Sequence, residues 1–222
     1  MMRLVALDLD NSLTDMVRNF DLCLSIVLCR LGKEKFSIDE IRTMVGGGSM
    51  KMVELGFPQN GGVDSCAHLE EVYFDFINEY SKKPTRLTSV YPGGIEVLNY
   101  LSEQGKRLAV CTNKPRATTD PVIKKLKLQK YFSIVCCGDE IPFQKPDGRH
   151  ISHILKLMKL NSNQAVMIGD SKTDVEAANN AGVRSITVSY GYDDDVLNYP
   201  KLDLVVDNLK QVPGAIDEIL SK

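Results

Sequence analysis

From residue 91 to its end, the chain repeats one pattern in which a short apolar run is followed by an amphipathic segment. The apolar runs read RLAVCTN, SIVCCGD, AVMIGD and RSITVSYG, and apolar residues recur at helical spacing between them. Strands that alternate with helices in this way pair in parallel and form an open, doubly wound sheet. The opening run LVALDLD also suits a strand buried on both faces. We therefore predict an α/β protein with a doubly wound parallel sheet, a Rossmann-like core.

The stretch after the first apolar run is predicted to be nearly all helix. Residues 16–32 have apolar side chains at spacings of three and four, and Ser37 followed by Glu40 is typical of a capping box that opens a second helix. A further long helix is predicted before KPTRLTSVYPGG. The predicted organisation is a catalytic core of residues 1–14 plus 88–222 and a small helical cap of residues 15–87, inserted after the first strand. In the core, Pro121 is expected in the first turn of a helix.

Charge and cysteine content exclude several classes of protein. Lysine and arginine total 27 against 29 acidic residues, so the net charge of -2 gives no electrostatic case for binding nucleic acid or an anionic membrane. The six cysteines form no CxxC pair, which argues against a zinc knuckle or a thioredoxin-like site. We see no signal peptide and no membrane-spanning run, and the expected location is the cytoplasm.

Polar residues follow the predicted strands at the points where each one ends. In an open parallel sheet, ligands bind outside the carboxyl ends of the strands, so these side chains should meet at one edge. The residues are Asp8 and Asp10 after the first strand, Thr112 and Asn113 after the second, Lys145 in the loop after the third, and Asp170 and Asp174 after the fourth.

This combination of side chains favours phosphoryl transfer. Clustered carboxylates repel one another unless a cation lies among them, and Mg²⁺ prefers a few carboxylates together with waters and phosphate oxygens. A phosphoryl group in turn needs lysine, hydroxyl and N–H donors. One carboxylate can attack phosphorus, and a second acid two residues away can protonate the leaving alcohol.

The motifs LVALDLDNSLTD, LAVCTN, QKP and IGDSKTD resemble, in order, the four motifs of the haloacid dehalogenase superfamily. The resemblance covers nearly the whole chain, and it is most specific to phosphoglycolate phosphatases and their relatives, which carry a small helical cap. It implies that Asp8 is the nucleophile and that Asp10 is the general acid and base. It also implies that Thr112 and Lys145 bind the transferring phosphoryl group.

The same resemblance implies a Mg²⁺ site. Its ligands would be Asp8, the backbone carbonyl of Asp10, and Asp170, while Asn113 and Asp174 would support the site or bind phosphate. Asn11 stands where the superfamily usually has glycine, and asparagine tolerates the left-handed backbone that this turn requires. Ser12 replaces the usual threonine and keeps its hydroxyl.

The expected activity is hydrolysis of a small phosphorylated metabolite, with phosphoglycolate as the leading candidate. Residues of the cap that could contact the leaving group are Arg18, Arg42, Gly47, Ser49 and Lys51. Asp10 argues against a dehalogenase, which needs no acid there. A phosphotransferase similar to β-phosphoglucomutase stays open, as does a non-catalytic phosphate-binding or receiver-type module. In receivers, however, the acidic residues precede the hydroxyl and the lysine in the sequence, whereas here Asp170 follows both Thr112 and Lys145.

Overall fold

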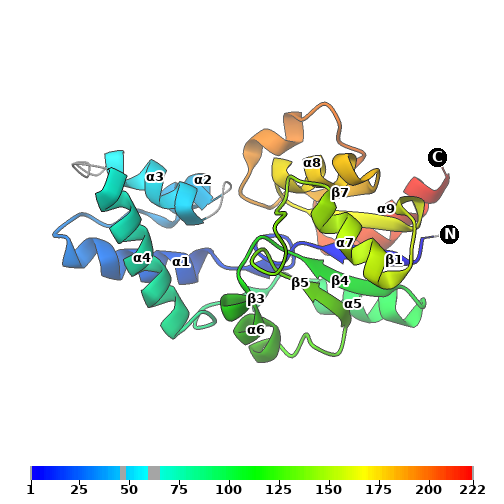
Figure 1. Ribbon diagram of the computed structural model, residues 1–222, viewed down its shortest axis with the longest axis horizontal. Helices are drawn as coiled ribbons and strands as arrows, with labels where there is room; N and C mark the ends of the chain where they lie inside the picture. Colours follow the sequence, from blue (N-terminus) through cyan, green and yellow to red (C-terminus); the bar gives the residue numbers. More distant parts are fainter. Residues whose placement is uncertain (1, 46–48, 60–65, 222) are drawn as a thin grey trace. The chain divides into compact units, whose positions relative to one another are not determined.

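The structure is a computed structural model that describes residues 2–45, 49–59 and 66–221. The chain divides into two compact units (Figure 1). One comprises Met1–Asp15 with Ser89–Lys222, and the other comprises Met16–Thr88. We refer to them as the α/β unit and the helical unit.

The α/β unit is built on a six-stranded sheet in the order β5-β4-β1-β6-β7-β8, and each neighbouring pair is parallel. The predicted fold class is therefore confirmed. The first strand lies inside the sheet, and its four residues are all buried, as its apolar sequence predicts. The strands are β1 (Leu4–Leu7), β4 (Arg107–Cys111), β5 (Phe132–Cys136), β6 (Ala165–Gly169), β7 (Arg184–Val188) and β8 (Leu204–Val206).

Helices cover both faces of this sheet (Figure 1). α7 (Arg149–Met158) and α8 (Lys172–Ala181) pack together on one face, while α5 (Gly94–Glu103) and α9 (Val212–Ser221) contact each other and the strands. Alternate residues of the strands, such as Leu4, Ala6 and Met167, join the buried cluster with α7 and α8. Three short 3₁₀ segments complete the unit: η1 (Ser162–Gln164), η2 (Asp194–Asn198) and η3 (Leu209–Gln211).

The prediction for Pro121 is wrong. Helix α6 spans Arg116–Lys125, so Pro121 lies inside the helix rather than in its first turn. The helix begins earlier because Pro115 precedes it, and the carbonyl of Pro115 accepts hydrogen bonds from the N–H groups of Thr118 and Thr119. Proline without an N–H removes one bond from the helical ladder, and here the fold tolerates that loss.

The helical unit consists of α1 (Val17–Arg30), α2 (Ile38–Val45), α3 (Ser49–Gln59) and α4 (Cys66–Lys82). The predicted capping box is present at the start of α2. The N–H of Ser37 donates to the Glu40 carboxylate over 2.7 Å, and the N–H of Glu40 donates to the Ser37 hydroxyl over 3.2 Å. The rings of Phe20, Phe76 and Tyr80 pack together between α1 and α4.

A two-stranded antiparallel ribbon, not predicted from the sequence, holds the ends of the α/β unit's two segments together. β2 (Thr14–Asp15) pairs with β3 (Ser89–Val90), with Thr14 opposite Val90 and Asp15 opposite Ser89. The chain leaves the α/β unit after Asp15 and returns to it at Ser89. Exit and re-entry therefore occur at adjacent, hydrogen-bonded residues.

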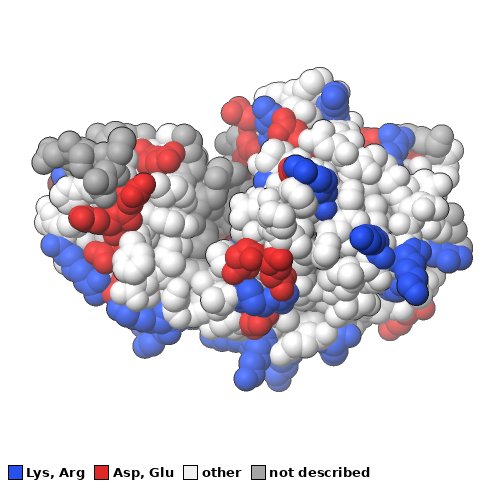
Figure 2. Space-filling view, in the orientation of Figure 1, with Lys and Arg blue, Asp and Glu red and all other residues white. Residues whose placement is uncertain are grey.

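The surface of the α/β unit carries charges of both signs. On the face shown in Figure 2, lysine and arginine side chains alternate with acidic ones instead of gathering into one basic field. Among the helices that the structure describes, none combines the length and the apolar character needed to cross a bilayer.

Candidate active site

The first strand ends directly at the candidate site. Asp8 follows Leu7, the last residue of β1, and the chain then makes a tight turn in which the N–H of Asn11 donates to the carbonyl of Thr14 over 2.7 Å. Asn11 has a φ of 63°, so the expected left-handed conformation is confirmed. The turn places the side chains of Asp8 and Asp10 beyond the carboxyl end of the central strand, as the topology requires.

Lys145 lies between two carboxylates. Its Nζ is 2.6 Å from Oδ1 of Asp8 and 2.6 Å from Oδ1 of Asp174, and all three side chains are nearly inaccessible, with exposed fractions of 3%, 11% and 3%. These residues come from three separate parts of the sequence that meet at the same sheet edge. An ammonium group this deeply buried has to be paired, and it is held where a phosphoryl oxygen could be bound.

The backbone position of Lys145 is fixed by Asn113. The side-chain amide of Asn113 donates to the carbonyl of Lys145 over 2.8 Å, and its carbonyl oxygen accepts the N–H of Lys145 over 2.9 Å. Thr112, directly before it, is buried, and its hydroxyl oxygen accepts the N–H of Lys114 over 3.3 Å. The residues after β4 thus orient the lysine as well as contributing a hydroxyl.

Asp170 is held on both oxygens. The Ser12 hydroxyl donates to Oδ1 over 2.7 Å, and the N–H of Tyr192 approaches Oδ2 at 3.4 Å. Gly191 packs directly beneath this carboxylate, because a Cβ at that position would lie 2.2 Å from Cβ of Asp170. Tyr190 supports the same corner, since its hydroxyl donates to the carbonyl of Ser12 over 2.6 Å.

Asp174 lies in the first turn of α8 and takes part in a capping box. Its Oδ2 accepts the N–H and the hydroxyl of Ser171, and its Oδ1 contacts Lys145. A Cβ on Gly169 would lie 2.3 Å from Cβ of Asp174, so the bare backbone is needed for this close approach. The positive end of the helix dipole and the ammonium group of Lys145 both lie next to this carboxylate.

The electrostatics of the cluster are those of crowded acidic groups. Burial raises the pKa of Asp8 to about 7, with the charge of Asp174 adding to the rise and Lys145 opposing it. Burial, with the charges of Asp174 and Asp8, also raises the pKa of Asp170 well above its usual range. For Lys145 burial lowers the pKa, but Asp174 and Asp8 outweigh it and the pKa is raised.

Three of these carboxylates could hold a metal ion. Asp8, Asp170 and Asp174 each offer an oxygen, and these atoms lie within 4.8 Å of one another. Such an all-oxygen donor set suits a hard divalent cation such as Mg²⁺. A cation there would favour the ionised forms of Asp8 and Asp170, whose pKa values are raised by burial and by the neighbouring carboxylates. The residues present therefore fit a divalent metal.

Lys114 and Asp10 form a further ion pair, which was not expected from the sequence. Nζ of Lys114 is 2.8 Å from Oδ2 of Asp10. Nothing in the sequence around Lys114 indicates this partner, which lies 104 positions away. Close by, Arg116 bonds to Glu140 and to the carbonyl of Val135.

The candidate cap residues belong to the helical unit. Arg18 is an exposed residue of α1, and Arg42 in α2 pairs with Asp39 at 3.0 Å. Ser49 and Lys51 lie in α3, while Gly47 is outside the described residues. Their relation to the carboxylate cluster stays a prediction.

Comparisons with known proteins show what this chain is similar to. The family model described as haloacid dehalogenase-like hydrolase matches residues 5–188. A phosphoglycolate phosphatase of Agrobacterium fabrum is 33% identical over 220 residues, which is 99% of this chain and 94% of that protein. One from Pseudomonas fluorescens is 32% identical over 218 residues, covering 97% of this chain and 80% of that protein. A crystal structure of a predicted phosphoglycolate phosphatase from Haemophilus somnus superposes with a TM-score of 0.85 at 24% identity, covering 97% and 98% of the two chains.

Proposed function

Because the chain belongs to the haloacid dehalogenase-like hydrolase family, we propose that it is a Mg²⁺-dependent phosphatase. Its substrate is a small phosphorylated metabolite, with phosphoglycolate the leading candidate. The names of the relatives that are about a third identical support this choice of substrate class.

The observation that carries the proposal is the contact between Lys145 and Asp8. A buried ammonium group 2.6 Å from a buried carboxylate, at the carboxyl end of a central parallel strand, keeps a nucleophile and an anion-binding group side by side. The same ammonium group also contacts Asp174. Its single positive charge is therefore shared between two carboxylates and does not fully neutralise Asp8. A phosphoryl group placed there would meet both the attacking oxygen and a cation.

The residues divide the reaction into two steps. In the first, a carboxylate oxygen of Asp8 bonds to phosphorus while the bond from phosphorus to the leaving oxygen breaks, and Asp10 gives its proton to that oxygen. In the second, Asp10 takes a proton from water as the water oxygen bonds to phosphorus and the bond to Asp8 breaks. Thr112 and Lys145 hold the phosphoryl oxygens in both steps.

The proposed metal ligands are Asp8, Asp170 and the backbone carbonyl of Asp10. Bound there, Mg²⁺ would neutralise negative charge on the phosphoryl group. Ser12 and Tyr192 orient Asp170 for this task, and such supporting hydrogen bonds tune metal affinity. Asp174 serves by holding Lys145 in place.

We further propose that the helical unit acts as a cap, with residues 1–14 plus 88–222 forming the catalytic core and residues 15–87 the insertion. Arg18, Arg42, Gly47, Ser49 and Lys51 are its candidate contacts to the leaving group, and an arginine or lysine there would suit a substrate that carries a carboxylate. The cysteines that the structure describes as free thiols fit the proposed cytoplasmic location.

A screen of small phosphomonoesters, with Mg²⁺ or with EDTA and ranked by kcat/KM, tests the proposal. Phosphoglycolate should rank at or near the top, and turnover should need the metal. Isomerisation of a sugar phosphate when a bisphosphate activator is added would identify the protein as a phosphotransferase instead of a hydrolase. Absence of phosphate release from every ester, including p-nitrophenyl phosphate, would reject an enzymatic role.

A further inference from the structure

Lys114 occupies a fixed position next to the reacting end of β1. It follows Thr112 and Asn113 at the end of β4, the strand that pairs directly with β1. Its N–H donates to the Thr112 hydroxyl oxygen over 3.3 Å, and its carbonyl accepts the N–H of Gly138 over 3.2 Å. The backbone of Lys114 is therefore anchored on both sides, and its side chain reaches across to the neighbouring strand exit.

The side chain ends on Asp10. Nζ of Lys114 lies 2.8 Å from Oδ2 of Asp10, and the exposed fractions of the two side chains are 6% and 21%. A charged hydrogen bond in such a sheltered place is stronger than an exposed one, because water does not compete for it. The contact therefore restrains the carboxyl group of Asp10 to one orientation.

The two oxygens of Asp10 are not equivalent. Oδ2 faces the ammonium group, whereas Oδ1 is buried and has no hydrogen bond within the described part of the chain. A buried acceptor without a protein partner is costly, and each such atom in a native structure calls for an explanation. An oxygen that exchanges a proton with the substrate would be one.

The two lysines of the site serve different carboxylates. Lys145 contacts Asp8 and Asp174, and Lys114 contacts Asp10. Asp8 and Asp10 are thus each held by an ammonium group delivered from a different loop. This arrangement separates the group that binds the phosphoryl end of a substrate from the group that orients the acid.

We propose that Lys114 is a positioning residue for Asp10 and that it selects Oδ1 as the atom that transfers protons. The inference rests on the proposed phosphatase function. Oδ2 accepts the Lys114 hydrogen bond whether or not Oδ1 carries a proton, because the carbonyl oxygen of a protonated carboxyl group is also an acceptor. In the first step the proton leaves Oδ1 for the leaving oxygen, and in the second Oδ1 takes a proton from water. Lys114 stays on Oδ2 in both.

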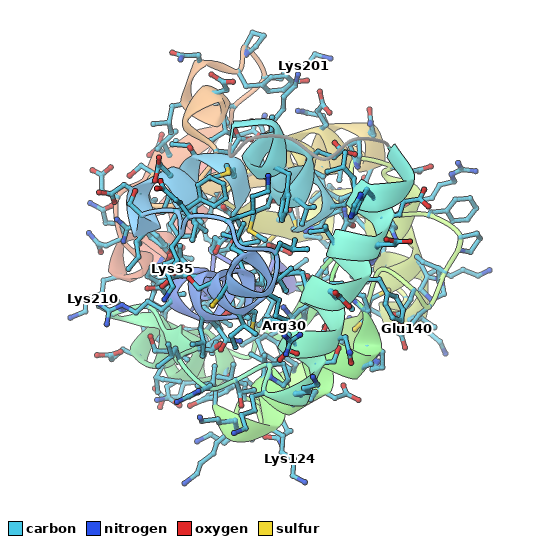
Figure 3. All side chains as sticks on the ribbon, turned by 90° about the vertical axis from the view of Figure 1, so that its left-hand side faces the viewer. Arg30, Lys35, Lys124, Glu140, Lys201 and Lys210 are labelled. Atoms are coloured by element: carbon cyan, nitrogen blue, oxygen red, sulfur yellow. The ribbon has the colours of Figure 1, made fainter. Side chains whose placement is uncertain are left out.

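The test compares Lys114→Met with wild type on two substrates, an alkyl phosphate and p-nitrophenyl phosphate. The alkyl oxygen needs a proton as it leaves and the nitrophenolate does not. Lys114→Met should therefore lower kcat roughly tenfold more for the alkyl ester than for the aryl ester, with KM little changed. Lys124→Met is the matched control and should behave as wild type, because Lys124 points away from α6 into solvent (Figure 3).

A double-mutant cycle with Asp10→Ala supplies the second arm. If Lys114 acts through Asp10, adding Lys114→Met to Asp10→Ala should change kcat less than about twofold. A full additional loss in that background, or a rise in KM without a loss of kcat, would overturn the inference. Should Lys114→Met fail to fold, Lys114→Gln keeps a neutral donor and enters the same cycle. Wild-type protein without phosphatase activity would reject the proposed function instead, before any variant is compared.

Discussion

The side chain of Asn113 and the backbone of Lys145 exchange two hydrogen bonds, of 2.8 and 2.9 Å. The asparagine side chain thus pairs with the backbone of Lys145 as a neighbouring strand would, and it fixes the residue whose ammonium group contacts Asp8. Asn113→Ala removes both bonds and leaves the N–H and carbonyl of Lys145 without that partner. We expect kcat to fall roughly tenfold and stability by about 1–3 kcal/mol. Asn113→Asp keeps one acceptor, so its free energy of unfolding in urea should lie between those of wild type and Asn113→Ala. Wild-type kcat in Asn113→Ala would contradict this role.

Asp8→Asn should abolish turnover while the fold persists. The amide is no nucleophile, so kcat on p-nitrophenyl phosphate should drop at least about 10³-fold, and no phosphoenzyme should form. The fold should survive because the change removes one negative charge from a crowded, buried cluster. Circular dichroism and acid-quenched labelling measure the two effects. Asp217→Asn, an exposed residue of α9, is the control, and substantial activity in Asp8→Asn would refute the nucleophile assignment.

Gly191→Ala should weaken metal binding. The new methyl group would meet Cβ of Asp170 at 2.2 Å, so either the carboxylate or the loop has to move. We expect the Mg²⁺ concentration for half-maximal activity to rise about 10-fold or more. Isothermal titration with Mg²⁺ provides a readout independent of turnover. Gly214→Ala is a suitable comparison because a Cβ there meets nothing within 4 Å. Equal affinities in both variants would show that Asp170 does not need the close packing.

Mg²⁺ should stabilise the folded protein. A ligand present at about 100 times its Kd adds about 2.7 kcal/mol to the free energy of unfolding, which for a chain of this length corresponds to roughly 5–10 °C in Tm. Differential scanning fluorimetry with Mg²⁺ or EDTA measures the shift. Asp170→Asn should lose most of it. A Tm that does not change at saturating Mg²⁺ would argue against the proposed ligand set.

The buried His150 should make the protein sensitive to acid. Burial, together with the charge of Lys145, lowers its pKa to about 4 against the opposing effects of the Cys136 backbone and the charge of Glu140. The unfolded chain takes up a proton near pH 6.5 while the folded chain does not, so stability falls as the pH drops from about 6.5 towards 4. Between pH 7 and 5 this contributes about 2 kcal/mol. In urea unfolding, the stability of His150→Leu should fall less than that of wild type between pH 7 and 5, by that amount. Equal losses of stability in the two proteins would contradict the prediction.

The sheet was predictable because its strands are continuous apolar runs separated by periodic helices, and the strand ends pointed to Asp8, Lys145 and Asp170. Contacts between distant residues were not. The partner of Lys114 lies 104 positions away, and the packing of Gly191 under Asp170 depends on two loops meeting in space. β2 and β3 escaped prediction because two residues are too few to show a period. Pro121 was misplaced because the preceding proline starts the helix earlier.

The β2–β3 ribbon has a consequence for how proteins of this kind diversify. Since the chain departs and returns at paired neighbours, the ends left by removing the intervening segment already lie next to each other. A different segment can be spliced between Asp15 and Ser89 without altering the register of the six-stranded sheet. Chimeras made at this junction should keep a folded core. The segment between Asp15 and Ser89 can therefore be replaced in evolution while the carboxylates and lysines at the strand ends of the sheet are kept.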